Sequence, residues 1–330
     1  MSFKRLDPED FLVSVDSITA TAWSTNSPTL TTFFTSSTTS TNDSYYKNVY
    51  QTGSTATGAA VQFAIAYGDL NGSGSANYND SVPGVSPTRT VYGQYRNLIY
   101  GSETAQFIFG TITASDFWAI SVDRARYKEH LLKGTFNLTL SGSGIQTLKL
   151  TDNSGMVSTD TYLDCGRVYQ IISGSNGTAY SGTGNSPSSG SYGLFLPDIA
   201  TIILNPLALS QSINLSPSRS SDIDGQNISK LFTAISGAAS FQLNSEESVT
   251  SDYVFVRARN SEFNYSENPS FISGSTGDVL YSNFINSPQT YVTTVGFYND
   301  TNELLAVAKL SKPLTKDFTK EALVRVKLDF

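Results

Sequence analysis

The loop from Asp69 to Asp80 is the stretch whose residue types and spacing most nearly match a known ligand site. Oxygen-bearing side chains stand at its positions one, three, five, nine and twelve, and Gly74 stands at position six. This is the ligand spacing of an EF-hand calcium loop, which makes Asp69, Asn71, Ser73 and Asp80 candidate calcium ligands. Asp80 replaces the usual bidentate glutamate, and a strand pattern precedes the loop. A plain polar turn is therefore the favoured interpretation, and we expect no metal and no cofactor.

The chain has one histidine, His130, and one cysteine, Cys165. Nucleophilic catalysis needs a nucleophile and a base that activates it, and the base is most often histidine. No serine lies in a G-x-S-x-G motif. We interpret His130, in YKEHLLK, as a surface or capping residue, and Cys165, in YLDCGRVY, as a small buried side chain. The residues therefore do not predict an enzyme.

Two groups of neighbouring carboxylates, Glu246–Glu247 and Asp222 with Asp224, are the residue type that cleaves glycosidic bonds in many hydrolases. Both groups lie in polar stretches, and the sequence does not bring two carboxyl groups to a working separation. We interpret them as loop residues.

The run DRARYKE, residues 123–129, is the densest cluster of charge in the chain. A solvated face is the usual role of an isolated charge run. An ion-pair network between subunits is the alternative, and it gains weight because charge is scarce elsewhere. We therefore keep Arg124, Arg126 and Lys128 as interface candidates.

Composition narrows the possible functions. Only 15% of the 330 residues are charged and the net charge is −7, with no stripe of lysine and arginine, so nucleic acid is not an expected partner. No run of about 20 apolar residues would insert into a membrane. The opening MSFKRLDPEDF lacks the apolar region of a secretory signal, and a single cysteine is compatible with folding in a cytoplasm.

Strand patterns dominate the chain. Apolar and polar residues alternate from Val13 to Phe34, and further strands are expected at 60–67, 88–100, 105–113 and 117–122 and over most of the chain after residue 240. Helical spacing predicts helices at 123–133 and 224–239, and Pro197 and Pro206 prevent LFLPDIATIILNPLAL from forming one long helix. We predict a mainly β chain of antiparallel β-sandwich or barrel-like modules with a few short helices.

Two domains are expected, because the chain is longer than a single core usually supports. A Gly/Ser-rich stretch at 174–193 predicts the joint, with β-rich domains at 1–173 and 194–330.

The polar stretch from Thr35 to Gly58 contains an aromatic island, Tyr45, Tyr46 and Tyr50. It predicts either a loop that its tyrosines hold in place or an arm that reaches a neighbouring subunit. Tyr192, at the end of the Gly/Ser-rich stretch, and Phe330, in the terminal segment, complete the interface candidates.

Several long segments resemble structural proteins of contractile-tailed bacteriophages, including cyanophages. They are FKRLDPEDFLVSVDSITATAWSTNSPTLTTFFTSS, SPTRTVYGQYRNLIYG, residues 116–140, GSYGLFLPDIATIILNP and TTVGFYNDTNELLAVAKLSKPLTKDFTKEALVRVKLDF. The layout of the last segment is similar to the closing part of baseplate wedge proteins. The resemblance implies a virion structural protein, and the family has no catalytic residues to transfer.

We therefore expect a non-enzymatic virion protein, assembled in the host cytoplasm in multiple copies, that contacts other baseplate and tail proteins. A structural role in the neck or on the capsid surface is one alternative. A receptor-binding module that recognises a host-surface glycan through its aromatic and amide-rich loops is another.

Overall fold

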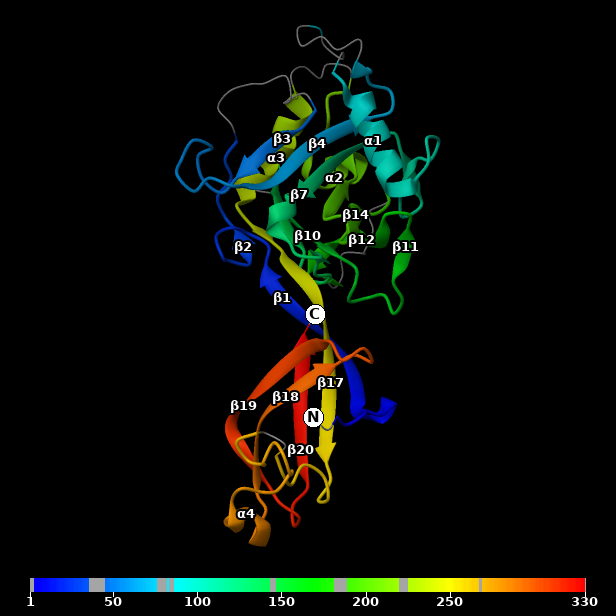
Figure 1. Cartoon of the computed structure of the whole chain (residues 1–330). Coiled ribbons are helices and arrows are strands. Elements are labelled where there is room, and N and C mark those ends of the chain that lie inside the picture. Colours follow the sequence, from blue (N-terminus) through cyan, green and yellow to red (C-terminus); the bar gives the residue numbers. More distant parts are fainter. Residues whose placement is uncertain are drawn as a thin grey trace. The chain divides into compact units, whose positions relative to one another are not determined.

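The computed structural model describes residues 3–35, 45–75, 82, 86–142, 147–180, 189–219, 225–266 and 269–329. The chain forms two compact units (Figure 1). Unit 1 combines residues 1–16 with 248–330, and unit 2 comprises residues 17–247. These bounds differ from the predicted division, because the expected joint at 174–193 lies inside unit 2. There β12 (Gly166–Ser175) and β14 (Gly193–Leu196) are antiparallel neighbours, so the segment joins adjacent strands of one sheet.

Unit 2 is built on a twelve-stranded sheet, and the predicted mainly β, antiparallel fold is confirmed. The pairings along its main path are antiparallel. In spatial order that path is β2 (Thr29–Leu30), β16 (Phe241–Gln242), β9 (Asn137–Ser141), β10 (Thr147–Asp152), β12, β14, β15 (Thr201–Leu204), β7 (Asp116–Val122), β4 (Val61–Asp69) and β3 (Lys47–Tyr50). The short strands β11 (Thr161–Leu163) and β13 (Thr178–Ala179) pair with β12.

Both faces of this sheet are covered. In β7, Trp118 and Ile120 belong to one buried apolar cluster, and Phe117 and Ala119 belong to another, because successive strand side chains point to opposite faces. The first cluster includes residues of α2 (Pro206–Ile213) and α3 (Gln226–Ala238). The second includes α1 (Thr88–Tyr100), which packs along β4 (Figure 1), and the small sheet of β5 (Phe107–Phe109) and β6 (Ile112–Ala114). Double burial explains the nearly continuous apolar sequence of β7.

The prediction of a strand at 88–100 is wrong, since these residues form α1. Its residues include the β-formers Val91 and Tyr92, which have low helix propensity. Val91, Tyr92 and Ile99 are nevertheless spaced so that a helix buries them on one face. Gly101, in the left-handed region at φ +57°, ends the helix. Burial of one helical face therefore overrides the local preference.

The helix predicted at 123–133 is also wrong. A single 3-10 turn occupies Arg124–Arg126, with the Asp123 carboxylate accepting a hydrogen bond from the Ala125 amide at 2.9 Å. His130 and Leu131 then form β8, which pairs with β17 (Asn244–Ala258). By contrast, α3 confirms the helix predicted at 224–239, and the proline-interrupted run forms β14, β15 and α2 instead of one helix, as expected.

Unit 1 contains two small sheets. β1 (Phe11–Thr21), β17 and β20 (Ala322–Asp329) form one in that order, and β18 (Thr290–Tyr298) and β19 (Leu304–Lys316) form a hairpin. A short helix, α4 (Ser282–Asn286), precedes the hairpin. The chain passes between the units within β1 and within β17. Among the described residues no helix has the length and apolar character needed to cross a membrane.

A half-buried ion pair fastens the turn between β14 and β15 to β12 in unit 2. The Arg167 backbone N–H donates to Asp198 at 2.7 Å, and the Arg167 guanidinium donates to both Asp198 oxygens. Gly166 adopts φ +116°, and a Cβ there would collide with the Asp198 carboxylate. Burial alone raises the pKa of Asp198, but the hydrogen bonds and charge of Arg167 outweigh it and hold the pKa below its ordinary value of 3.8.

We predict that Asp198→Asn lowers the free energy of unfolding of unit 2 by about 1–3 kcal/mol at pH 7, because charged hydrogen bonds are lost. Because the folded-state pKa is depressed, the native pair stabilises the fold above pH 3.8 and loses this effect as the pH falls further. The difference between the two proteins should therefore shrink in acid. Urea titrations followed by tryptophan fluorescence measure it, since both tryptophans, Trp23 and Trp118, lie in unit 2.

The exposed Asp164→Asn is the matched control and should leave stability unchanged. A stability difference for Asp198→Asn that stays constant between pH 7 and pH 3 would contradict the prediction.

Candidate functional site

The predicted calcium loop follows β4. Asp69 is buried, and its Oδ1 accepts a hydrogen bond from the Asn71 amide at 2.9 Å, which closes a turn. A Cβ on Gly72 would collide with Thr88 of α1, so the loop lies directly against that helix. Asp80 is outside the described residues. Within them no group of three or more His, Cys, Asp or Glu side chains is placed to hold a metal ion. Calcium binding by Asp69, Asn71, Ser73 and Asp80 stays untested.

His130 lies in a polar cluster that differs from a catalytic triad. Its Nε2 is 3.0 Å from Oε2 of Glu246, and the hydroxyl of Ser17 donates to the other oxygen of Glu246. The glutamate therefore stands between the serine and the histidine, whereas a triad needs the histidine between serine and acid. Burial raises the pKa of Glu246, but the bonds from Ser17 and His130 outweigh this and lower it. The cluster ties β1, β8 and β17 together within unit 2.

Cys165 and the remaining carboxylates do not form a reactive centre in the described residues. Cys165 is half-buried, and its burial raises the pKa of the thiol, which disfavours the reactive thiolate. Asp222 and Asp224 are outside the described residues, and Glu247 is a half-buried neighbour of Glu246 in β17.

A buried polar cluster that sequence reasoning missed surrounds Asp116, at the start of β7. The Tyr67 hydroxyl donates to Asp116 at 2.9 Å, and Arg219 binds both carboxylate oxygens at 2.9 and 3.0 Å. Burial, followed by the charge of Asp116, raises the pKa of Tyr67 well above its ordinary value. The sequence feature that could have revealed this cluster is an acidic residue, Asp116, at the start of an apolar strand. The bidentate pairing satisfies that acid, so the cluster has a structural role.

The predicted interface residues lie in different settings. Of the aromatic island, Tyr46 is exposed, Tyr45 is half-buried against the second apolar cluster, and Tyr50 is half-buried at the end of β3. Tyr192 is buried in the core, and its hydroxyl is 2.9 Å from that of Ser212, so it does not contribute to the surface of the single chain. Phe330 is outside the described residues.

The charged run at 123–129 is partly engaged with its own backbone. Arg124 lies over the Tyr127 ring at 4.7 Å and donates to the Tyr127 carbonyl at 2.7 Å. Arg126 is half-buried and Lys128 is exposed. In the described part of the chain none of these three residues forms a salt bridge, and their role at an interface stays a prediction.

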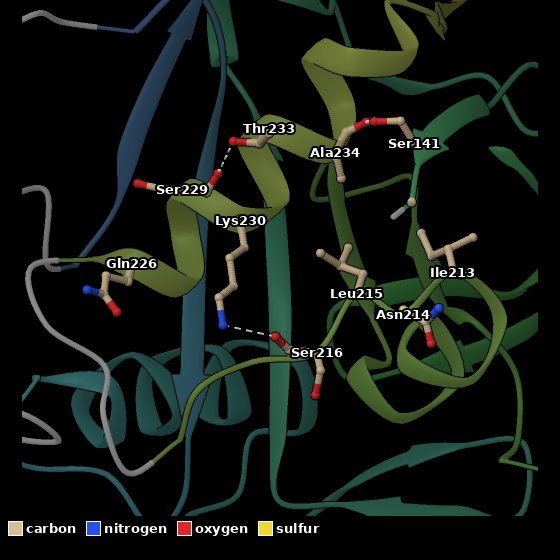
Figure 2. Close-up of a pocket in the computed structure, with 11 residues that line it drawn as sticks. Ser141, Ile213, Asn214, Leu215, Ser216, Gln226, Ser229, Lys230, Thr233 and Ala234 are labelled. Atoms are coloured by element: carbon tan, nitrogen blue, oxygen red, sulfur yellow. Dashed lines mark hydrogen bonds between the residues drawn. The ribbon is translucent and has the colours of Figure 1, made fainter. Parts of the chain in front are cut away.

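A cavity of about 920 Å³ lies between α3, the end of α2 and β9 (Figure 2). Three of its polar side chains are engaged with nearby backbone: Ser141 donates to the Ala234 carbonyl at 3.0 Å, Thr233 to that of Ser229 at 2.9 Å, and Lys230 to that of Ser216 at 3.1 Å. A ligand site needs polar groups that converge on the ligand. These groups instead brace the helix, and the cavity indicates no particular ligand.

The distribution of apolar side chains in unit 1 is the feature that points to function. Among its described residues only Val254, Ala322 and Val326 are buried apolar side chains, and both apolar clusters of the molecule are drawn from unit 2. Seventeen large apolar side chains of unit 1 are exposed: Phe3, Phe11, Leu12, Val13, Val15, Tyr265, Val279, Leu280, Tyr281, Ile285, Tyr291, Tyr298, Leu304, Leu305, Val307, Phe318 and Leu323. Such surfaces mark sites of interaction.

β1 contributes part of this surface. It stands at one end of its sheet, so its outer edge is unpaired in the described part of the chain. Phe11, Val13 and Val15 project from one face of the strand, and Val15 is 65% exposed. A long, exposed, apolar end strand associates readily with another chain as long as nothing covers its edge.

The β18–β19 hairpin contributes a second part. In the described residues its strands pair only with each other. Tyr298, Leu304, Leu305 and Val307 are exposed, Leu305 to 68%. The ring of Phe3 meets that of Tyr298 edge-to-face, with centroids 5.3 Å apart. A two-stranded hairpin is marginally stable in water by itself, so this element needs further packing.

No family model, curated protein or solved structure matches the chain.

Lys316 anchors the end of the hairpin inside unit 1. Its side chain is fully buried, and its ammonium donates to the Asn260 carbonyl at 3.1 Å, the Asn264 side-chain oxygen at 2.7 Å and the Asp317 carbonyl at 3.0 Å. A lysine has three N–H donors, so the group is fully satisfied. The bonds to Asn260 and Asn264 attach the hairpin to the loop that follows β17.

We predict that Lys316→Met weakens unit 1 and leaves unit 2 intact. Each acceptor left without a partner in a buried site costs about 1–3 kcal/mol. Hydrogen exchange with mass spectrometry should therefore show faster exchange in peptides covering 304–316 and unchanged protection in β7. Lys320→Met, at an exposed position, is the control. Equal protection of the hairpin in Lys316→Met and in the parent would contradict the anchor.

Proposed function

We propose that this chain is a non-enzymatic structural subunit of a contractile-tailed phage virion, in the tail baseplate, and that it works through contacts made by unit 1. One observation carries the proposal: unit 1 leaves seventeen large apolar side chains exposed and buries three. Water-exposed apolar surface on this scale is stabilised when another protein covers it. Unit 2, with its two-faced core, supplies a rigid body that carries the contact unit.

The location of the resembling segments supports this assignment. The phage-like opening segment begins at Phe3 and contains β1. The closing segment, whose layout resembles that of baseplate wedge proteins, contains most of β18 and all of β19. Two of the five resembling segments therefore contain elements of unit 1 that expose apolar side chains, and the other three lie in unit 2.

The chemistry of the described residues agrees with a role in assembly. His130, Glu246 and Ser17 hold strands together, Asp116 is neutralised by Arg219, and the cavity side chains bond to their own backbone. These groups fix geometry. The proposed mechanism is correspondingly geometric: unit 1 buries its apolar surface against neighbouring subunits.

Quantitative mass spectrometry of gradient-purified phage particles tests the proposal. We expect the chain in a fixed copy number, in sixfold multiples that match the baseplate proteins. Antibodies raised against the chain should label the tail end of the particle. Absence of the chain from purified particles would refute the proposal, and labelling at the neck or capsid would refute the baseplate location.

We predict that replacing Val13 and Val15 by serine reduces incorporation into particles at least tenfold. Both side chains are already exposed in the single chain, so their loss removes contact area with a partner and leaves the intramolecular core unchanged. The matched control is serine at Met156 and Val157, two exposed apolar residues of unit 2, which should be incorporated normally. Equal incorporation of both variants would contradict a contact role for β1.

A further inference from the structure

Two elements of unit 1 carry apolar side chains together with opposite charge. The arm, which we define as residues 7–16, contains four acidic residues and no basic one, and it includes Phe11 to Val15. On the β18–β19 hairpin, β19 carries two exposed lysines, Lys309 and Lys312, and no acidic residue, beside Leu304 to Val307, whereas the turn before it holds Asp300 and Glu303. Asp7 and Glu9 on the arm, and Lys309 and Lys312 on the hairpin, are exposed. In the described part of the chain these four side chains form no salt bridge.

The exposed area is large enough for stable association. A large apolar side chain presents roughly 150–200 Å² when fully exposed. The seventeen exposed apolar residues of unit 1, at 37–68% exposure, therefore present on the order of 1,500 Å². One partner contributes about 800 Å² to an interface of standard size. Unit 1 thus has enough apolar surface for two interfaces.

We infer that copies of this chain assemble head to tail, with the arm of one copy lying against the β18–β19 hairpin of the next. Two complementary patches on one molecule, acidic-apolar and basic-apolar, meet the requirement of a heterologous contact, which closes into a ring when the rotation allows. Each subunit would use both patches, which matches the area available for two interfaces. The inference rests on the proposed function, because it takes the surface of unit 1 to be an assembly surface.

The small core of unit 1 favours a second copy over a different protein. A unit with three buried apolar side chains gains little from burial to offset the ordering of its backbone, so association stabilises the fold itself. Such a unit needs its partner when it folds. Other copies of the same chain are always present when the chain folds, whereas a different protein need not be.

The backbone also allows this contact. The outer edge of β1 is unpaired, and in the described residues both outer edges of the hairpin are unpaired as well. An exposed edge strand binds a second strand through main-chain hydrogen bonds, while alternate side chains fill the apolar surface. Asp7 and Glu9, just before β1, would then face Lys309 and Lys312 across the contact. These opposite charges attract each other, whereas a contact between two copies of the same patch would bring like charges together.

A charge-swap experiment on the full chain tests the inference. The arm variant carries Asp7→Lys and Glu9→Lys, and the hairpin variant carries Lys309→Glu and Lys312→Glu. We expect each variant alone to be monomeric at concentrations where the parent is oligomeric by light scattering after size exclusion. Mixing the two variants should restore oligomers, because each arm again meets a hairpin of opposite charge. A chain with all four changes should assemble by itself.

The control for the arm variant is Glu103→Lys with Asp164→Lys, and the control for the hairpin variant is Arg89→Glu with Gln94→Glu and Asn97→Glu. Each makes the same change in net charge as its variant at exposed positions of unit 2 and should assemble like the parent. A monomeric parent at all concentrations would overturn the inference. Loss of assembly in only one of the two variants would also overturn it, because that result indicates a contact between identical patches. A mixture of the two variants that stays monomeric would overturn it as well.

Carbodiimide cross-linking gives a second measurement that does not depend on the variants. It joins carboxylates to amines that are in contact. In a mixture of ¹⁴N- and ¹⁵N-labelled parent chains, we expect a mixed-isotope link between Glu9 and Lys309 or Lys312. Links confined to one isotope would overturn the inference. If the chain forms oligomers with this link but is absent from phage particles, only the proposed function is refuted. If the chain is present in particles but is a monomer, only the head-to-tail contact is refuted.

Discussion

A strand that is apolar on both faces must be covered on both faces, and β7 imposes this requirement on unit 2. Trp118 and Phe117 are neighbours in sequence but pack into separate clusters, so helices and a small sheet must cover the two sides. The covered sheet buries most of the large apolar side chains in the described part of unit 2. In its described residues unit 1 has no strand of this kind. Its sheets bury few apolar side chains, so the burial that stabilises unit 1 within the chain is small.

The two units therefore have different physical roles. Unit 2 is held by its own core and by internal pairs such as Arg167–Asp198 and Arg219–Asp116, so it has a defined shape without a partner. Unit 1 is held by exposed or half-buried pairs such as Lys4–Glu262 and Arg257–Glu321, by Lys316 and by the Val254–Val326 pair across β17 and β20. Its exposed apolar side chains, in less than a third of the chain, are the surface that the proposed function assigns to contacts.

The sequence predicted the mainly β, antiparallel character, the helix at 224–239 and the break at Pro197 and Pro206. The prediction failed at 88–100, where Val91 and Tyr92 favour a strand by propensity. A helix forms there because it buries Val91, Tyr92 and Ile99 on one face against the sheet. The sequence prediction also missed the surface of unit 1. The alternation in VSV at residues 13–15 predicts a strand, but the same letters describe a strand with a covered face and one with an exposed face. Only the packing of distant segments distinguishes them, as it does for the Asp116 cluster.

Unit 1 is assembled from the two ends of the chain, residues 1–16 and 248–330. A ribosome completes the whole of residues 17–247 before it has made β18, β19 and β20. The self-supported unit is therefore available to fold first, while the arm has no strand to pair with until β17 emerges. The contact surface proposed for unit 1 is consequently completed after the core of unit 2, so the order of synthesis itself limits premature association of nascent chains through that surface.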